Sequence, residues 1–276
     1  MRFAERLEAA AKRNNSLLCV GLDPDVRRFP THLRSDPSAI VDFNRAIIEA
    51  TSDLVCAYKP NLGFYMAYGA AGIEALIETR RMIDPSIPVL LDAKVGDIGV
   101  TSEAYARGYY GTMGFDAVTV HPYIGLDGLE PFLCHEDRAA FILVRTSNPG
   151  SADLQNLNVS DGDQQVPLYQ RMAEKVADWQ EQFGTCGVVV GATWPHELAD
   201  VRRICPDVPI LIPGVGTQGG DLEASVKAGL DASGGGILIN SSRGITYAGS
   251  GPDFARAARM AAQALRDNIN EIRQAL

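Results

Sequence analysis

Charged side chains stand where an apolar run ends in the segment LLDAKVGDIGV, residues 90–100. Side chains alternate between the two faces of a β-strand, so Asp92 and Lys94 share a face with Leu90 below them. Opposite charges held in a low-dielectric pocket stabilise each other, and such groups perform proton transfer and electrostatic catalysis. The segment therefore predicts a catalytic strand end, against the alternative of a solvated loop with incidental charges.

Polar residues follow other apolar runs as well. Asp23 ends the run LLCVGLD, and Lys59 stands near the end of LVCAYKP. If these runs are parallel strands, their carboxyl ends meet at one rim. Lys59 would then join Asp92, Lys94 and Asp97 in an alternating row of two ammonium groups and two carboxylates, charges that would be costly to bury alone.

Two further segments carry the residue types that bind phosphate. The segment PGVGTQGGD, residues 213–221, is rich in glycines that let backbone N–H groups approach a ligand closely. Asp221 has the position of a helix cap. Arg243, in the segment NSSRG, supplies a guanidinium fork suited to phosphate. The alternative interpretation is a set of turn glycines beside a surface arginine.

The elements that must position these residues follow a regular order. Eight short apolar runs predict strands over residues 17–23, 54–60, 88–94, 115–120, 140–146, 186–192, 209–214 and 236–241. Segments with helical apolar spacing lie between them. Strand then helix, repeated eight times, predicts one (β/α)₈ TIM barrel over residues 1–276, with its active site at the carboxyl ends of the strands. A doubly wound open sheet is the alternative, but GLDPD at 21–25 lacks its Gly-rich first turn.

One connection is long. Residues 147–168 are polar and without clear periodicity, which predicts a functional lid or a mobile segment. The four histidines are scattered, so they predict structural roles rather than a metal site. Trp179 and Trp194 are interpreted as packing residues. Ser147 has no histidine and carboxylate at nucleophile-elbow spacing, which argues against a hydrolase triad.

Composition excludes several classes of protein. The chain has 276 residues, 46% of them hydrophobic, and a net charge of −9. That charge argues against nonspecific nucleic-acid binding, which needs a broad basic surface. No apolar stretch reaches the ~20 residues that span a bilayer, and the amino terminus resembles no signal peptide. We therefore expect a cytoplasmic protein whose five cysteines are reduced thiols, mostly in the core.

The strand-end motifs together resemble one family. Residues Asp92 to Ile98 match the DxKxxDI signature of orotidine 5′-monophosphate decarboxylase. GLDPD, YKPNLGFY, TSNPG, PGVGTQGGD and NSSRGI follow in the order of that family's other motifs, so the resemblance spans nearly the whole chain. The longer segment after TSNPG is similar to a divergent bacterial-type branch, and it leaves the lid contacts open.

The resemblance implies a decarboxylase that converts orotidine 5′-monophosphate to uridine 5′-monophosphate with no metal and no cofactor. Lys59, Asp92, Lys94 and Asp97 would form its charged tetrad, with Lys94 as the proton donor. Family knowledge also implies a homodimer, in which Asp97 and Thr101 reach the partner's site. The remaining residues carried over as substrate contacts are Asp23 and Lys59 for the ribose, Ile98 for the partner's pocket, Ser147 for the pyrimidine, and Gln218 and Arg243 for the phosphate.

Two other functions stay open. A sugar-phosphate decarboxylase or aldolase of the same superfamily shares the Asp-x-Lys-x-x-Asp pattern but uses a divalent metal. Such an enzyme is expected to have a carboxylate where this chain has Lys59, and a cation there opposes metal binding. A non-catalytic nucleotide-binding barrel is the second alternative, although it does not need the whole tetrad. We expect no fused phosphoribosyltransferase domain, because only a helical tail follows the last predicted strand.

Overall fold

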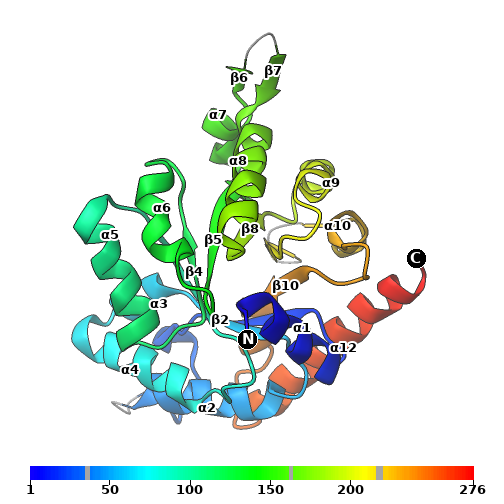
Figure 1. Cartoon of the computed structure of the whole chain (residues 1–276). Coiled ribbons are helices and arrows are strands. Elements are labelled where there is room, and N and C mark those ends of the chain that lie inside the picture. The colour runs from blue at the N-terminus through cyan, green and yellow to red at the C-terminus, as the bar shows by residue number, and fades with distance from the viewer. Residues whose placement is uncertain (35–37, 162–163, 216–219) are drawn as a thin grey trace.

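Eight parallel strands form the centre of the computed structural model, which describes residues 1–34, 38–161, 164–215 and 220–276 (Figure 1). All eight predicted strands are present, each within a residue or a few of the predicted bounds. They are β1 Leu18–Leu22, β2 Ala57–Pro60, β3 Leu90–Val95, β4 Ala117–Val120, β5 Ala139–Arg145, β8 Cys186–Val190, β9 Ile210–Pro213 and β10 Ile237–Ser241.

The strands close into a barrel. Their order in the sheet is β2-β1-β10-β9-β8-β5-β4-β3, and the neighbouring strands within it pair in parallel. The two end strands, β2 and β3, are joined by the parallel bridges Tyr58↔Val89 and Asn61↔Asp92. This cyclic order is that of a (β/α)₈ barrel, so the predicted fold class is confirmed and the open doubly wound sheet is excluded.

A helix follows each barrel strand and packs its apolar side against the sheet. In the last helix, for example, Phe254, Ala258 and Ile269 are buried at helical spacing. The helices that cover the barrel are α2 Ala39–Thr51, α4 Gly69–Met82, α5 Gly99–Ala106, α6 Leu126–Leu133, α8 Leu168–Phe183, α9 Pro195–Ile204, α10 Leu222–Gly229 and α12 Phe254–Gln274. Shorter helical turns are η1 Val26–Arg28, α3 Leu62–Met66, η2 Arg107–Thr112, η3 Pro149–Ser151, α7 Ala152–Gln155 and α11 Arg243–Thr246.

The first helix, α1 Phe3–Arg13, packs against the interior of the barrel. Phe3 and Leu7 belong to the same buried cluster as interior residues such as Leu90 and Leu238, and the Phe3 and Phe141 rings lie 5.7 Å apart. Helix α1 thereby covers apolar surface that an empty barrel end would expose to water.

The long connection after β5 contains secondary structure that the sequence periodicity does not predict. It contains the turn η3, helix α7 and an antiparallel hairpin of β6 Asn158–Asp161 and β7 Gln164–Pro167, which projects from the barrel (Figure 1). Strands of four residues are too short for their alternation to stand out. Two residues of sequence, Gly162 and Asp163, separate them, a spacing and composition typical of a hairpin loop that could have predicted it.

All five cysteines are free, as predicted, and four are buried. Cys134 is the exposed one. Burial raises the pKa of Cys19 and of Cys186 to about 12, so these thiols stay protonated at neutral pH. Within the described part of the chain, no helix combines the length and hydrophobicity needed to cross a membrane.

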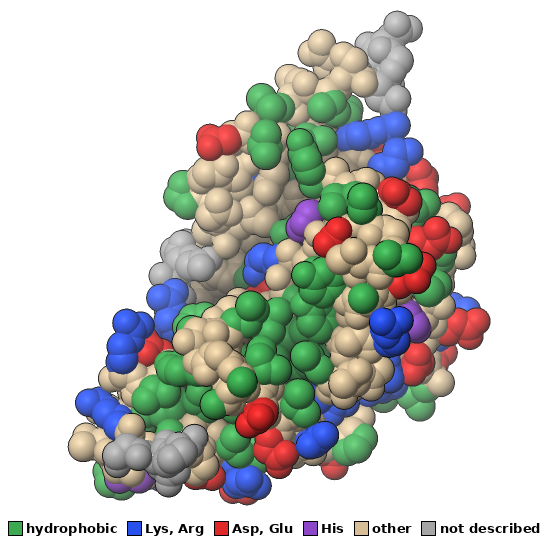
Figure 2. Space-filling model, turned by 90° about the vertical axis from the view of Figure 1, so that its left-hand side faces the viewer, with side chains coloured by type: hydrophobic (Ala, Val, Ile, Leu, Met, Phe, Trp, Pro, Cys, Tyr) green, Lys and Arg blue, Asp and Glu red, His purple; other side chains and the backbone are tan. Residues whose placement is uncertain are grey.

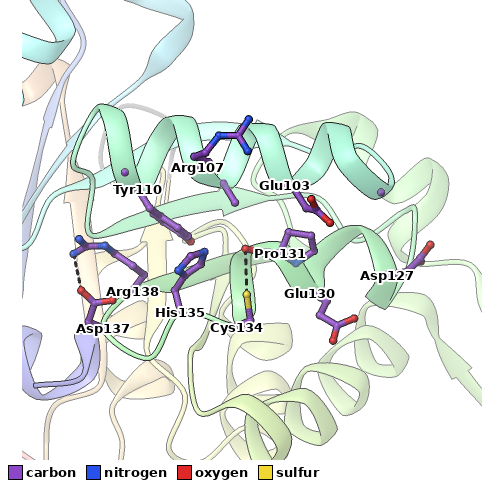
Figure 3. Close-up of a pocket in the computed structure, with 13 residues that line it drawn as sticks. Glu103, Arg107, Tyr110, Asp127, Glu130, Pro131, Cys134, His135, Asp137 and Arg138 are labelled. Atoms are coloured by element: carbon purple, nitrogen blue, oxygen red, sulfur yellow. Dashed lines mark hydrogen bonds and ion pairs between the residues drawn. The ribbon is translucent and has the colours of Figure 1, made fainter.

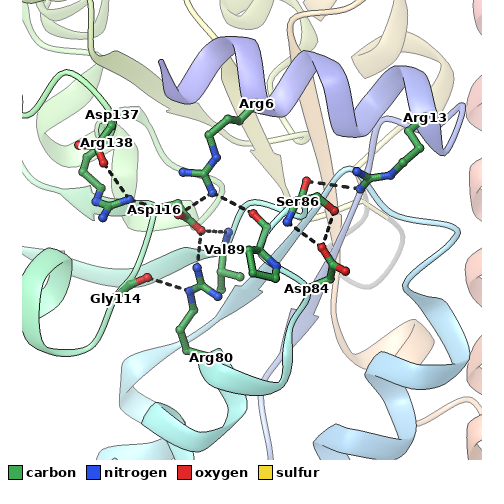
Figure 4. Close-up of polar contacts among 11 residues, drawn as sticks. Arg6, Arg13, Arg80, Asp84, Ser86, Val89, Gly114, Asp116, Asp137 and Arg138 are labelled. Atoms are coloured by element: carbon green, nitrogen blue, oxygen red, sulfur yellow. Dashed lines mark hydrogen bonds and ion pairs between the residues drawn. The ribbon is translucent and has the colours of Figure 1, made fainter. Parts of the chain in front are cut away.

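One buried carboxylate, Asp116, holds several elements together where β4 begins (Figure 4). Its side chain is 2% exposed and forms ion pairs with Arg6 of α1 at 2.8 Å, Arg80 of α4 at 3.1 Å and Arg138 at 3.4 Å. It also accepts a hydrogen bond from the backbone N–H of Val89 at 2.9 Å. This cluster anchors the covering helix α1 to the barrel.

We expect Asp116→Asn to lower the free energy of unfolding by about 3 kcal/mol, because three guanidinium groups lose their shared buried counter-charge. Urea unfolding measures this change. Asp137→Asn is the matched control, since Asp137 also pairs with Arg138 but is 61% exposed, and its loss should cost under about 0.5 kcal/mol. Equal effects of the two substitutions would contradict a special role for Asp116.

Candidate active site

A row of three charges lies at the carboxyl ends of β2 and β3. Lys59 is 3% exposed, and its Nζ lies 2.9 Å from Asp92 Oδ2. Lys94 Nζ lies 2.5 Å from the other carboxylate oxygen, Asp92 Oδ1. The side chain of Lys94 is 48% exposed, so this end of the row faces solvent. Three of the four predicted tetrad residues are thus in direct contact.

Two residues that the sequence did not single out complete the environment of Asp92. Asn61 donates a hydrogen bond from Nδ2 to Asp92 Oδ2 at 3.0 Å, and Thr119 donates from Oγ1 to Asp92 Oδ1 at 3.1 Å. Together with Lys59 and Lys94, these groups give each carboxylate oxygen two donors. A buried carboxylate with this many donors is fixed in orientation as well as in charge.

Two members of the row, Lys59 and Asp92, stay ionised at neutral pH. Burial by itself would raise the pKa of Asp92, but the charges of Lys59 and Lys94 outweigh it and hold that pKa well below its usual range. Burial would likewise lower the pKa of Lys59, but Asp92 and Asp23 raise it above its usual value. Asp92 is therefore a carboxylate and Lys59 an ammonium group across the physiological pH range.

The backbone of Lys94 has a strained conformation near the end of β3. Its φ of 49° lies in the left-handed region, which costs a residue with a β-carbon about 1 kcal/mol. The pairing of β3 with β4 shifts register between Leu91 and Val95. The Lys94 backbone N–H donates to Thr119 Oγ1 at 2.9 Å. Thr119 thus holds both Lys94 and Asp92 in place across the irregular strand end.

Asp23, which follows β1, places a hydrogen-bond acceptor at the carboxyl end of the barrel strands. Within the described residues, its buried Oδ1 has no hydrogen-bond partner. The surrounding loop is held firmly, because Tyr247 donates its hydroxyl to Asp23 O at 3.0 Å. Gly21 is required nearby, since a β-carbon there would lie 1.7 Å from Ser242 Oγ. A buried acceptor without a partner suits a ligand hydroxyl, as the predicted ribose contact requires.

The fourth residue of the predicted tetrad, Asp97, lies apart from the row. Its Oδ1 accepts a hydrogen bond from the Ile98 N–H at 2.9 Å, and the ion pairs found among the described residues do not include it. Helix α5 begins two residues later, and both Ile98 and Thr101 are exposed there. Within one chain the structure therefore brings three of the four charges into contact, while Asp97 is partly buried and Ile98 and Thr101 are exposed.

The predicted phosphate segment is described at its two ends. Gly214 has a φ of 98°, and its carbonyl accepts a hydrogen bond from the Gly220 N–H at 3.3 Å, which closes the base of the loop. Asp221 caps α10 by accepting from the Ala224 N–H at 3.1 Å, as predicted. Gln218 lies outside the described residues. Arg243 begins α11 with an exposed side chain and forms no ion pair with the residues that the structure describes.

Ser147 lies two residues after the end of β5, and its backbone carbonyl accepts a hydrogen bond from the Thr193 hydroxyl at 3.3 Å. The two tryptophans, both interpreted from the sequence as packing residues, differ in their surroundings. Trp179 is a buried packing residue. Trp194 is only partly buried and donates its indole N–H to the carbonyl of Thr146 at 2.9 Å, next to Ser147.

A separate hollow of about 710 Å³ lies between α5 with η2 and α6 (Figure 3). Carboxylates such as Glu103 and Glu130 and cations such as Arg107 line it together, and the Cys134 thiol donates to Pro131 O at 3.7 Å. None of its described lining residues stands at the carboxyl end of a barrel strand. In the described ranges, no three His, Cys, Asp or Glu side chains are grouped so as to hold a metal ion.

A (β/α)₈ barrel with a Lys–Asp–Lys row at the carboxyl ends of its strands has the architecture of the barrel enzymes, whose active sites lie at that face. Comparison with known proteins identifies the family to which the chain belongs. The model of the orotidine 5′-phosphate decarboxylase / HUMPS family matches residues 16–259, and the chain belongs to this family.

Individual relatives agree along the whole chain. Orotidine 5′-phosphate decarboxylase of Thermomicrobium roseum is 57% identical over 274 residues, which cover 99% of this chain and 97% of the relative. The solved OMP decarboxylase of Leishmania donovani is 42% identical with a TM-score of 0.87, and the match covers 99% of this chain and all of that one. UMP synthase of Leishmania donovani is 44% identical with a TM-score of 0.88, but the match covers only 57% of that longer chain.

We expect Asp92→Asn to lower the free energy of unfolding by about 3 kcal/mol at neutral pH, because the buried Lys59 loses its closest counter-charge. The folded-state pKa of Asp92 lies below its unfolded value of about 3.9. Its stabilisation is therefore fully present above about pH 4 and is lost as the pH falls through the lower folded-state pKa.

Urea unfolding of both proteins between about pH 7 and pH 2 measures this difference. Asp178→Asn, at a side chain that is 67% exposed, is the control and should change stability by less than about 0.5 kcal/mol. If the difference in unfolding free energy between wild type and Asp92→Asn increased as the pH fell, the lowered folded-state pKa of Asp92 would be contradicted.

Proposed function

We propose that the chain decarboxylates orotidine 5′-monophosphate to uridine 5′-monophosphate, as a step of de novo pyrimidine biosynthesis. The Lys59–Asp92–Lys94 row is the observation that carries the proposal, because it places a half-exposed ammonium group beside a permanently ionised carboxylate. The names of the relatives, which match this chain over nearly its full length, support the same reaction.

The chemistry requires a proton and an electrostatic partner. When the bond between C6 and the carboxylate breaks, CO₂ leaves and the electron pair stays on C6. An ammonium group close to C6 stabilises that developing charge and then transfers a proton to it, which forms the new C–H bond. No further acceptor of electrons is needed, so we propose that the reaction uses neither a metal nor another cofactor.

Lys94 is the proposed proton donor because its neighbours are unsuited to the task. Asp92 carries no proton at neutral pH, since its pKa is held well below the usual range. Lys59 is buried, and Asp92 and Asp23 raise its pKa, so it releases its proton poorly. Lys94 reaches solvent with about half of its side chain and can regain a proton there after each turnover.

Asp92 has two proposed roles. It holds the Lys94 ammonium group through the 2.5 Å contact. It would also lie against the substrate carboxylate, so that repulsion is relieved when CO₂ leaves. Asn61 and Thr119 keep Asp92 from turning away from this repulsion, because both donate hydrogen bonds to it.

The rest of the substrate is assigned to the other strand ends. We propose that Asp23 and Lys59 bind the ribose hydroxyls, which fits the buried Asp23 oxygen without a partner. Ser147 would read the pyrimidine, and Gln218 and Arg243 would bind the phosphate. Contacts with this remote group provide binding energy that helps the loops close around the ring.

We further propose a homodimer in which Asp97, Ile98 and Thr101 complete the partner's site. All three lie at or near the start of α5 and outside the row of their own chain. Large apolar side chains are exposed in the same region, and Figure 2 shows hydrophobic side chains gathered on the face of the molecule that carries α5. The exposed set on α3 and around α5 is Phe64, Met66, Ile98, Val100 and Tyr105.

Residues 1–276 are proposed to act as one catalytic domain in the cytoplasm. Five free cysteines, four of them buried, suit a reducing compartment. The substrate and the product are both phosphorylated nucleotides, which are retained where they are made.

Chelator-treated wild-type protein is expected to convert orotidine 5′-monophosphate, and Lys94→Ala is expected to lower kcat by at least about 10⁴-fold, because the proton donor and its charge are both lost. The fall in ultraviolet absorbance of the pyrimidine measures the reaction. Lys12→Ala, at an exposed lysine of α1, is the matched control and should retain full activity.

The same assay separates the alternatives. Arg243→Ala should mainly raise KM and also slow turnover, because phosphate contacts contribute to the transition state. Activity that survives in Lys94→Ala but not in Arg243→Ala would refute the catalytic assignment. Activity that disappears with the chelator and returns with a divalent metal would favour the metal-dependent relatives.

Mixing two inactive variants tests the shared site. A dimer of one Lys94→Ala chain and one Asp97→Asn chain has one doubly impaired site and one intact site if Asp97 acts in the partner. Random reassociation should then restore about a quarter of the wild-type activity. No recovery from the mixture, with dimers verified by light scattering, would place Asp97 in the site of its own chain.

A further inference from the structure

We propose that Arg145 and Trp194 are positioning residues that hold the Ser147 segment in its binding geometry. Neither residue belongs to the proposed catalytic row or to its substrate contacts. The inference rests on the proposed function, because it assigns the pyrimidine to Ser147.

Arg145 is a fully buried cation at the end of β5. Its side chain is 0% exposed, and its guanidinium lies 4.0 Å from the centre of the Trp194 ring. Nη1 donates to Ser151 Oγ and to Gln155 Oε1, and Nη2 lies 3.8 Å from Glu197 of α9. A guanidinium stacked on an aromatic ring in a buried site is rigid and costly to displace.

The network around Arg145 fixes the backbone just before Ser147. The Thr146 N–H donates to Gln155 Oε1 at 2.8 Å, and the Thr146 carbonyl accepts from the Trp194 indole N–H at 2.9 Å. Both polar groups of this peptide segment are therefore held by side chains that also contact Arg145. The direction in which the chain enters residue 147 is set by this arrangement.

Close packing against residues 191–194 further restricts the position of Ser147. The Gly191 N–H donates to Arg145 O at 2.7 Å, and a β-carbon on Gly191 would lie 2.6 Å from the Ser147 Cα. Thr193 donates its hydroxyl to Ser147 O. Ser147 thus lies directly against the segment 191–194 that follows β8.

The segment 191–194 also contacts the phosphate loop. The Ala192 N–H donates to Pro213 O at 2.9 Å, and Ser225 Oγ donates to Ala192 O at 3.3 Å. A β-carbon on Gly220 would lie 2.5 Å from the Ala192 Cβ, so Gly220 packs closely against Ala192. One short segment therefore lies between the residue assigned to the pyrimidine and the loop assigned to the phosphate.

This geometry predicts a selective defect. Trp194→Phe keeps an aromatic ring over Arg145 but removes the N–H that holds the Thr146 carbonyl. Binding of uridine 5′-monophosphate should weaken about fivefold, the effect of one lost hydrogen bond. Binding of ribose 5-phosphate, which lacks the pyrimidine, should change by less than about twofold. Misplacement of the ring should also lower kcat about tenfold.

Isothermal titration with both ligands and steady-state kinetics measure these effects. Trp179→Phe is the matched control, because Trp179 is buried in α8 and contacts neither segment through a hydrogen bond among the described residues. It should lower stability and leave both affinities unchanged. Thr193→Val removes the hydroxyl that is hydrogen-bonded to Ser147 O, and we expect the same selective loss of uridine 5′-monophosphate binding. This second variant tests the proposal if Trp194→Phe does not fold.

Selective loss of uridine 5′-monophosphate binding in either variant would support positioning. Equal weakening of both ligands, or no change in either, would overturn it. Failure of wild-type protein to convert orotidine 5′-monophosphate is a different result, since it would overturn the proposed function while the ratio of the two affinities still reports on the Ser147 segment.

Discussion

The ion pair between Lys59 and Asp92 is the interaction on which the site depends. An ammonium group that is 3% exposed is tolerated only beside a carboxylate, and that carboxylate is itself buried. The two residues stand on β2 and β3, the end strands of the sheet order, which are joined by isolated bridges rather than a full ladder. The ion pair thus spans the seam at which the barrel closes, and closure and charge placement support each other.

Residues on or beside the neighbouring strands stabilise this ion pair. Asn61 follows the last residue of β2 and Thr119 lies on β4, so the carboxylate on β3 is held from both sides. The strained backbone of Lys94 is stabilised by the same threonine. The carboxyl ends of these strands thus combine a strained residue with a buried ion pair, while the Asp116 cluster anchors α1 to another part of the barrel.

Apolar periodicity was sufficient to predict the eight strands and the barrel, because each strand is buried on both faces and reads as a continuous apolar run. The contact among Lys59, Asp92 and Lys94 was also predictable, since strand ends meet at one rim. The roles of Asn61 and Thr119 were not, because they depend on cross-strand register that short polar residues do not reveal. Trp194 looked like a packing residue, and only its position beside Thr146 distinguishes it from Trp179. The hairpin of β6 and β7 was missed because its strands are short and polar.

The covering helix α1 has a consequence for synthesis on the ribosome. Arg6 bonds to Asp116, 110 residues further along the chain, and Phe3 packs against Phe141. At about 5–20 residues per second, roughly 5 to 20 s pass between emergence of the helix and emergence of its partners. During this interval the apolar side of α1 has no barrel to cover. The helix therefore emerges before the surface that it covers, and the order of translation opposes the order of assembly.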